Sequence, residues 1–124
     1  MNVKVDRNFN RFQNDVAALT DDELVKIMKQ FSHIEKLTWT MVQAQTSRTQ
    51  GESGGLNWKK LDGQKTSLGD QVHSLRMSKT VRARAFRSAE YMVFLSLHPK
   101  HGAEYDEPGL EEVEGLPVKI AAGS

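Results

Sequence analysis

The chain has 124 residues, with 17 Lys and Arg against 16 Asp and Glu, and a formal net charge of +1. This length suits one domain, with or without a tail. No run of about 18 apolar residues occurs, so we expect no membrane-spanning helix. The sequence has no cysteine, which excludes disulfides, a thiolate zinc site and a cysteine nucleophile. The first residues lack the apolar stretch of a signal peptide, so the expected location is the cytoplasm.

The near-zero net charge is made of segments that differ strongly. Residues 1–57 carry seven basic and seven acidic side chains, whereas residues 58–101 carry nine basic and three acidic ones. Residues 102–124 carry one basic side chain and six acidic ones. Such asymmetry indicates a surface for a polyanion beside an acidic tail.

Amphipathic helices are predicted in the first third of the chain. Apolar residues recur three and four positions apart from Phe9 to Leu19, and again from Leu24 to Phe31. Between the two segments, Thr20 and Glu23 have the spacing of a capping box, which starts the second helix. The short gap predicts a helical hairpin. A further helical stretch is expected to restart at Thr38.

The second half of the sequence changes from helical to strand-like periodicity. Residues 46–57 are polar and rich in glycine, so they are predicted to form a flexible loop. Apolar residues then alternate with polar ones in residues 72–78, 81–87 and 91–98, and the short turns between these runs predict an antiparallel meander. Residues 106–124 are expected to form an acidic C-terminal extension.

The expected fold class is therefore α+β, with an N-terminal helical hairpin packed on a small antiparallel sheet. A single domain is expected over residues 1–105. If each turn has three residues, Arg76 lies opposite Arg82, and Ala85 lies opposite Val93. One face is then apolar and can take the hairpin: Leu75, Met77, Val81, Ala83, Ala85, Val93, Leu95 and Leu97. The opposite face is polar: Ser74, Arg76, Arg82, Arg84, Ser96 and His98, with Phe86, Met92 and Phe94 at one end.

The clustered arginines of the polar face have two interpretations. Like charges directly opposite on neighbouring strands destabilise a sheet unless an anion relieves the repulsion. One interpretation is a phosphate site, because guanidinium groups donate to phosphate oxygens in a bidentate manner, and nearby aromatic rings could stack on unpaired bases. The other is a solvated face, or one whose arginines pair with the acidic tail.

Residues that can move protons follow the last predicted strand. His98 and His101 titrate near neutrality, and Lys100 and Tyr105 can donate or stabilise charge. The two histidines could instead be ordinary surface residues after a strand. A His-x-x-His pair could also bind a metal ion, but no third ligand stands at a suitable spacing. We therefore expect no metal and no other cofactor.

The order of these elements resembles a known family. The sequence of residues 73–105 is HSLRMSKTVRARAFRSAEYMVFLSLHPKHGAEY, which resembles the C-terminal sheet of RelE/ParE-superfamily toxins of bacterial toxin–antitoxin systems. In those proteins, a strand carrying Leu-Arg, a tight turn and an arginine-bearing strand lead to a final strand with a basic tail containing His or Tyr. The counterparts here are Leu75-Arg76, residues 81–86, residues 95–98 and Tyr105.

The resemblance implies a RelE-like fold and a metal-independent endoribonuclease, an mRNA interferase that cleaves mRNA, commonly on the ribosome. It also implies a cognate antitoxin that binds and neutralises the toxin in a hetero-oligomer. Arg82 matches the arginine that stabilises the scissile phosphate, and Tyr105 matches the C-terminal tyrosine that stacks on a base or assists proton transfer. His98, Lys100 and His101 fall where members place basic or histidine residues.

In such a reaction the RNA 2′-hydroxyl attacks its own phosphate, which requires a base, a cation and an acid. The predicted catalytic residues are Arg82, His98, His101 and Tyr105. The predicted RNA-binding residues are Arg76, Arg84, Lys100, Lys59, Lys60 and Arg87.

Three alternatives remain open from the sequence. A member of the same fold could lack nuclease activity, as in a ParE-like inhibitor of DNA gyrase. The chain could be a plain RNA-binding regulatory protein. It could also be a structural or regulatory protein whose acidic tail covers its own basic face.

Overall fold

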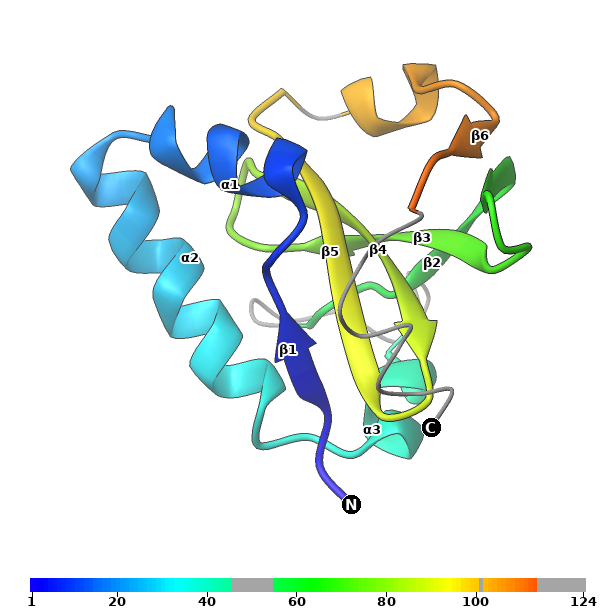
Figure 1. Cartoon of the computed structure of the whole chain (residues 1–124). Helices are drawn as coiled ribbons and strands as arrows, with labels where there is room; N and C mark the ends of the chain where they lie inside the picture. The colour runs from blue at the N-terminus through cyan, green and yellow to red at the C-terminus, as the bar shows by residue number, and fades with distance from the viewer. Residues whose placement is uncertain (46–54, 101, 114–124) are drawn as a thin grey trace.

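The computed structural model in Figure 1 describes residues 1–45, 55–100 and 102–113. These residues form one six-stranded curled sheet of order β1-β5-β4-β3-β2-β6. The strands are β1 (Lys4–Asp6), β2 (Lys59–Thr66), β3 (Gln71–Arg76), β4 (Arg82–Ser88), β5 (Tyr91–His98) and β6 (Leu110–Glu111). The helices are α1 (Asn10–Ala17), α2 (Asp21–Ile34), α3 (Trp39–Ala44) and the short 3-10 helix η1 (Ala103–Asp106). None of the helices in this part of the chain has the length and apolar character needed to cross a membrane.

The predicted helical hairpin on a small antiparallel sheet, the RelE-like arrangement, is wrong. The chain begins with β1, which pairs with β5 in parallel, and β6 pairs with β2 in parallel. The sheet is therefore mixed, strands dominate the fold, and α3 is a third helix. The two parallel pairs join segments that lie far apart in the sequence, and β1 and β6 have only three and two residues. Strands this short carry no readable periodicity.

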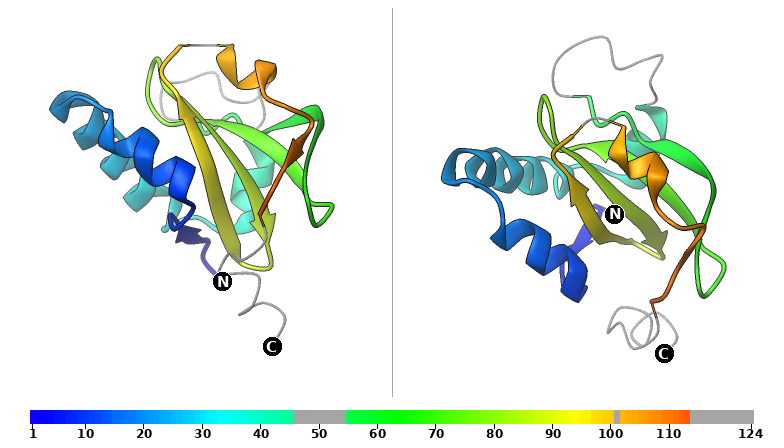
Figure 2. Two further views of the ribbon diagram at one scale, coloured as in Figure 1. Left: turned by 45° about the horizontal axis from the view of Figure 1, so that its top comes forward. Right: turned by 90° about the horizontal axis from the view of Figure 1, so that it is seen from above.

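The sheet separates two apolar clusters. Figure 2 shows α1 and α2 on one side of the sheet and η1 on the other. On the helix side, Phe12 and Phe31 pack against Phe94 of β5, with ring centroids 5.2 and 5.1 Å apart. The smaller second cluster consists of Leu61, Val72, Phe86, Val93, Leu95 and Val113. Both faces of the central strands are thus covered, and the second face is only partly apolar.

The helix starts predicted at Thr20 and Thr38 are confirmed, whereas α1 begins after Phe9 without a side-chain cap and not at Asp6. The Thr20 hydroxyl accepts from the backbone amide of Glu23 at 3.2 Å, and the Glu23 carboxylate accepts from the amide of Thr20 at 3.0 Å. This reciprocal capping box begins α2. Thr38 begins α3, where its hydroxyl accepts from the amide of Met41. Each cap satisfies amide groups that a helix terminus otherwise leaves without partners.

The predicted register holds across one hairpin and fails across the other. Arg76 lies opposite Arg82 as expected. Between β4 and β5, however, Arg84 lies opposite Ser96 and Ala85 lies opposite Phe94, so Leu95 has no opposite residue. This β-bulge reverses the side-chain alternation along β5. The predicted pairing of Ala85 with Val93 is therefore wrong.

Phe94 is fully buried at the contact between the sheet and both helices. Replacing Phe94 by Ala should lower the free energy of unfolding by about 3–5 kcal/mol, because it leaves a cavity in the core. Urea denaturation followed by circular dichroism measures this loss. Val25→Ala, at a side chain that is 54% exposed, is the control and should change the value by less than about 0.5 kcal/mol. A loss at Phe94 as small as that at Val25 would contradict this packing.

Candidate functional site

The polar face of the sheet consists of Ser74, Arg76, Arg82, Arg84, Ser96 and His98, from β3, β4 and β5. The strand register arranges these residues in two rows across the sheet. The inner row is Ser74, Arg84 and Ser96, and the outer row is Arg76, Arg82 and His98. The predicted clustering of polar residues is thus present, although only part of it is open.

The inner arginine, Arg84, is fully buried. Its Nε donates to Oε1 of Gln64 at 3.0 Å. Its Nη1 donates to Oγ of Ser96 at 3.2 Å and to Oε1 of Glu111 at 2.9 Å. Its Nη2 is buried and has no hydrogen-bond partner. The Glu111 carboxylate balances the charge of this guanidinium, because an unpaired buried charge is strongly destabilising.

A second carboxylate, Glu107, lies over the same row. Arg11 of α1 donates to both of its oxygens, at 2.6 and 2.7 Å. Nη1 of Arg84 lies 3.8 Å from Glu107 Oε1, and Nε2 of His98 lies 3.9 Å from Oε2. The hydrogen bond from Arg11 lowers the pKa of Glu107; burial opposes this effect, and the charges of Arg11, Arg84 and His98 add to it.

His98 lies inside this cluster and not at an open mouth of the face. Its ring is buried, and Nε2 lies 2.8 Å from Oγ of Ser96. Burial lowers the pKa of His98, and the neighbouring Glu107 partly offsets that effect. In this arrangement only 6% of His98 is exposed. His101, the other predicted histidine, lies outside the described residues.

The outer arginines differ from Arg84 in their partners. Nη1 of Arg82 donates to the backbone carbonyls of Ser78 and Val81, at 3.2 and 3.4 Å. Nε of Arg76 is buried and has no hydrogen-bond partner. Within residues 1–45, 55–100 and 102–113, neither Arg76 nor Arg82 forms an ion pair with a carboxylate. Burial lowers the pKa of Arg82, and the charge of Arg76 adds to that effect. Arginine nevertheless remains charged at neutral pH.

Helix η1 brings two further groups to the polar face. Glu104 is buried; its Oε2 accepts from the Ser74 hydroxyl at 3.3 Å and its Oε1 from the amide of Gly102 at 3.0 Å. The charge of Glu104 raises the pKa of Arg82 and so partly offsets the effect of burial. Tyr105 is 47% exposed, and Nζ of Lys59 lies 5.1 Å from the centre of its ring.

The other predicted RNA-binding residues are spread over the surface. Lys60 is exposed and lies 3.9 Å from Asp62. Lys100 is exposed in the segment before η1. Arg87 lies near the opposite end of β4, with its guanidinium 4.7 Å from the ring centre of Trp39. The structure therefore places Arg76, Arg82, Lys59 and Tyr105 near one another and leaves Arg87 apart.

Several residues of this site were not predicted individually. Gln64 of β2 and Glu104 and Glu111 of the C-terminal segment form hydrogen bonds with residues of the polar face. Glu107 lies 3.8 and 3.9 Å from Arg84 and His98, and Arg11 of α1 joins the site through its bonds to Glu107. The only signal for the three glutamates was the acidic character of the tail, which suggested pairing with the arginines. Nothing in the local sequence around Arg11 indicates a partner 96 residues away.

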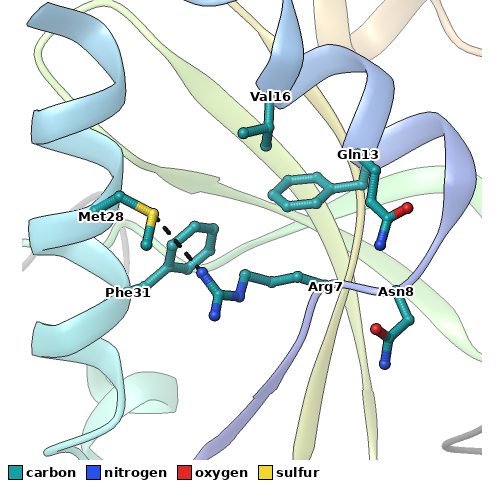
Figure 3. Close-up of a pocket in the computed structure, with 7 residues that line it drawn as sticks. Arg7, Asn8, Gln13, Val16, Met28 and Phe31 are labelled. Atoms are coloured by element: carbon teal, nitrogen blue, oxygen red, sulfur yellow. Dashed lines mark hydrogen bonds between the residues drawn. The ribbon is translucent and has the colours of Figure 1, made fainter. Parts of the chain in front are cut away.

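A separate cavity of about 330 Å³ lies on the helix side, between α1, α2 and the segment after β1. Figure 3 shows Arg7 extending between Phe31, Met28 and Asn8 at this cavity. The Arg7 guanidinium lies 4.9 Å from the ring centre of Phe31, and its Nη1 lies 3.7 Å from Sδ of Met28. None of the predicted site residues lines this cavity.

No protein-family model, curated protein or solved structure matches the chain. The likeness to RelE/ParE-superfamily toxins therefore depends on residues 73–105 alone. The site itself offers an amine, a phenol and two guanidinium groups that form no ion pair within the described residues, all at one end of the sheet. Such groups can bind a phosphate, stack on a base and transfer a proton.

Replacing Glu107 by Gln tests the electrostatics of the covered row. A carboxyl whose pKa is lowered in the fold stabilises the folded state fully above its unfolded pKa, about 4.3. That stabilisation is lost as the pH falls through the folded pKa. The free energy of unfolding of the unmodified chain should therefore fall more between about pH 5 and about pH 3 than that of Glu107→Gln. Urea denaturation at each pH measures the difference.

The matched control is Glu112→Gln, at an exposed side chain in the same segment. Its loss of stability over this pH range should follow that of the unmodified chain. Equal losses in Glu107→Gln and in the unmodified chain would mean that Glu107 contributes nothing to acid sensitivity.

Proposed function

We propose that the chain is a metal-independent endoribonuclease that cleaves mRNA, as the toxins resembled by residues 73–105 do. The observation that carries this proposal is the Arg76–Arg82 pair. The two side chains lie directly opposite each other on neighbouring strands and form no ion pair within the described residues. Repulsion between them is relieved when an anion binds. A phosphodiester suits the pair because guanidinium groups bind phosphate oxygens in a fixed planar geometry.

Neighbouring groups favour a nucleic acid over a free phosphate ion. Tyr105 exposes about half of its side chain beside Lys59. An exposed aromatic ring next to cations can stack on an unpaired base while the cations bind the backbone. Single-stranded RNA presents its bases in this way, whereas paired bases in a duplex are not free to stack on side chains.

The proposed chemistry is attack of the RNA 2′-hydroxyl on the adjacent phosphorus. The 2′-oxygen forms a bond to phosphorus while the bond from phosphorus to the 5′-oxygen breaks. A base removes the proton from the 2′-hydroxyl, and an acid protonates the departing 5′-oxygen. The products are a 2′,3′-cyclic phosphate and a 5′-hydroxyl. No water or metal ion enters the balance of this step.

The residues take separate roles in this reaction. Arg82, together with Arg76, stabilises the negative charge that develops on the phosphate oxygens. Tyr105 stacks on a base or transfers a proton, and the resemblance assigns proton transfer to His101 as well. His98 is enclosed by Ser96 and Glu107, so it can transfer a proton to RNA only if the segment that carries Glu107 moves away.

The resemblance supplies the biological context of the proposal. It implies a bacterial cytoplasmic protein that acts on mRNA, commonly on the ribosome, and is restrained by a cognate antitoxin in a hetero-oligomer. The burial of His98 favours a second candidate function, an RNA-binding regulatory protein without nuclease activity. Measuring binding and cleavage separately distinguishes the two.

Arg82→Ala is the primary test of the phosphate site. Cleavage of a single-stranded RNA in the presence of EDTA should fall about 10²–10³-fold, the loss typical of one group that stabilises transition-state charge. Binding to uncleavable 2′-O-methyl RNA should weaken, and the slope of log affinity against log salt should fall by about 0.7, as for the loss of one phosphate contact. Growth arrest on induction in a bacterium should be lost in parallel.

Lys36→Ala is the control, because Lys36 is exposed after α2, away from the polar face. It should leave cleavage and salt slope close to those of the unmodified chain. Undiminished cleavage by Arg82→Ala would refute the proposed site. Binding that requires Arg82, with no cleavage by the unmodified chain, would identify the regulatory protein instead.

Tyr105→Phe tests the role of the phenol. The variant keeps the ring next to Lys59 and removes only the hydroxyl, so binding to 2′-O-methyl RNA should be unchanged. Cleavage should fall about 10²-fold or more if the hydroxyl transfers a proton. Tyr105→Ala removes the ring as well and should also weaken binding, by about 1–3 kcal/mol for one lost stacking contact. Full cleavage by Tyr105→Phe would exclude a proton-transfer role.

A further inference from the structure

Three cationic or titratable groups from different elements converge on the carboxylate of Glu107. Arg11 of α1 binds both oxygens, while Arg84 of β4 and His98 of β5 lie 3.8 and 3.9 Å away. Arg84 also binds Glu111. Two guanidinium groups and an imidazole around one anion form a donor set that suits phosphate as well as carboxylate.

The carboxylates leave part of this donor set unused. Nη2 of Arg84 is buried in a fully buried side chain and has no hydrogen-bond partner. An unsatisfied buried donor is costly, so most buried donors in proteins are paired. A tetrahedral phosphate directs its oxygens differently from a planar carboxylate and can therefore engage a donor that the carboxylates miss.

The segment that carries both glutamates is attached to the sheet by few contacts. Its strand β6 pairs with β2 at Lys65–Leu110 and Thr66–Glu111, and the amides of Lys65 and Ser67 donate to the carbonyls of Gly109 and Glu111. Figure 1 shows β6 at the edge of the sheet, next to β2. The amide of Val113 donates to Oγ of Ser67, and Val113 is the one fully buried side chain among residues 107–113. Elements with few buried contacts at an edge open at a lower free-energy cost than the core.

We propose that Arg11, Arg84 and His98 form a second phosphate-binding site for single-stranded RNA, which Glu107 and Glu111 occupy when no RNA is bound. This inference rests on the proposed function and adds to it. Arg84 and Arg82 are two residues apart on β4, roughly 7 Å, so the two sites can take neighbouring phosphates of one strand. RNA then competes with residues 107–113 for the polar face.

The first test is the double variant Glu107→Gln with Glu111→Gln, which removes the negative charge of both side chains and keeps their shape. Its affinity for 2′-O-methyl RNA should rise about tenfold or more, as expected for charge-assisted hydrogen bonds released from internal partners. Its salt slope should steepen by about 0.7 for each added phosphate contact. The control is Glu35→Gln with Glu112→Gln, which changes net charge equally at exposed side chains. An equal gain in the control would overturn the proposal.

The second test locks the segment in place without touching the ion pairs. The chain has no cysteine, so Lys65→Cys with Leu110→Cys introduces the only possible disulfide, between directly paired residues of β2 and β6. Neighbouring strands lie within disulfide reach. Oxidation should lower RNA affinity at least tenfold relative to the same protein after reduction. Equal affinities in the oxidised and reduced forms would overturn the proposal even if the glutamine variant did not fold.

Pyrophosphate separates this inference from the proposed function. Isothermal titration should detect pyrophosphate binding by the Glu107→Gln, Glu111→Gln variant and not by its Arg84→Met derivative, whether or not the chain cleaves RNA. Suppose that RNA binding depends on Arg82, but that the Glu107→Gln, Glu111→Gln variant binds RNA and pyrophosphate no better than the unmodified chain. The second site is then refuted, and the proposed function stands. If the variant binds pyrophosphate but the chain neither binds nor cleaves RNA, the anion site is supported and the ribonuclease function is refuted.

Discussion

The burial of Arg84 constrains the whole second half of the fold. A guanidinium taken out of water costs several kcal/mol unless its charge and donors find partners, and Arg84 is fully buried at the centre of the sheet. Its partners come from three different strands: Gln64 of β2, Ser96 of β5 and Glu111 of β6. The chain after β5 must therefore cross the polar face and join the far edge of the sheet. Among the described residues, Arg82, two residues away, donates only to backbone carbonyls, and this difference leaves it available for another anion.

The sequence predicted those parts of the fold whose determinants are local. The capping box of Thr20 and Glu23 and the cap at Thr38 depend on residues three positions apart, so their spacing is sufficient evidence. The alignment of Arg76 with Arg82 followed from a short turn. The bulge at Leu95 could not be predicted, because an extra residue in one strand leaves no trace in a period-two pattern until the partner strand is known. The parallel pairing of β1 with β5 has no connecting turn to reveal it.

For the candidate site too, the sequence predicted the residues with local determinants and missed those whose partners lie far along the chain. The outer arginines and Tyr105 could be singled out because they stand in a recognisable order within one short stretch. The partners that bury His98 could not, since Glu107 reaches it only through the path of the chain after η1. Charge asymmetry showed that an acidic segment was available. It could not show that the segment covers Arg84 while Arg82 forms no ion pair within the described residues.

Strand β1 has a consequence for how other proteins can approach this molecule. It covers β5 only from Tyr91 to Val93. Farther along the same strand, Oδ2 of Asp15 accepts the hydrogen bond of the Leu97 amide at 2.9 Å. The Asp15 carboxylate of α1 thus accepts from a backbone amide that would otherwise be free to pair with a strand of another protein. A partner cannot extend the sheet by β-augmentation past this point without displacing Asp15, so recognition on this side must come from side chains and shape.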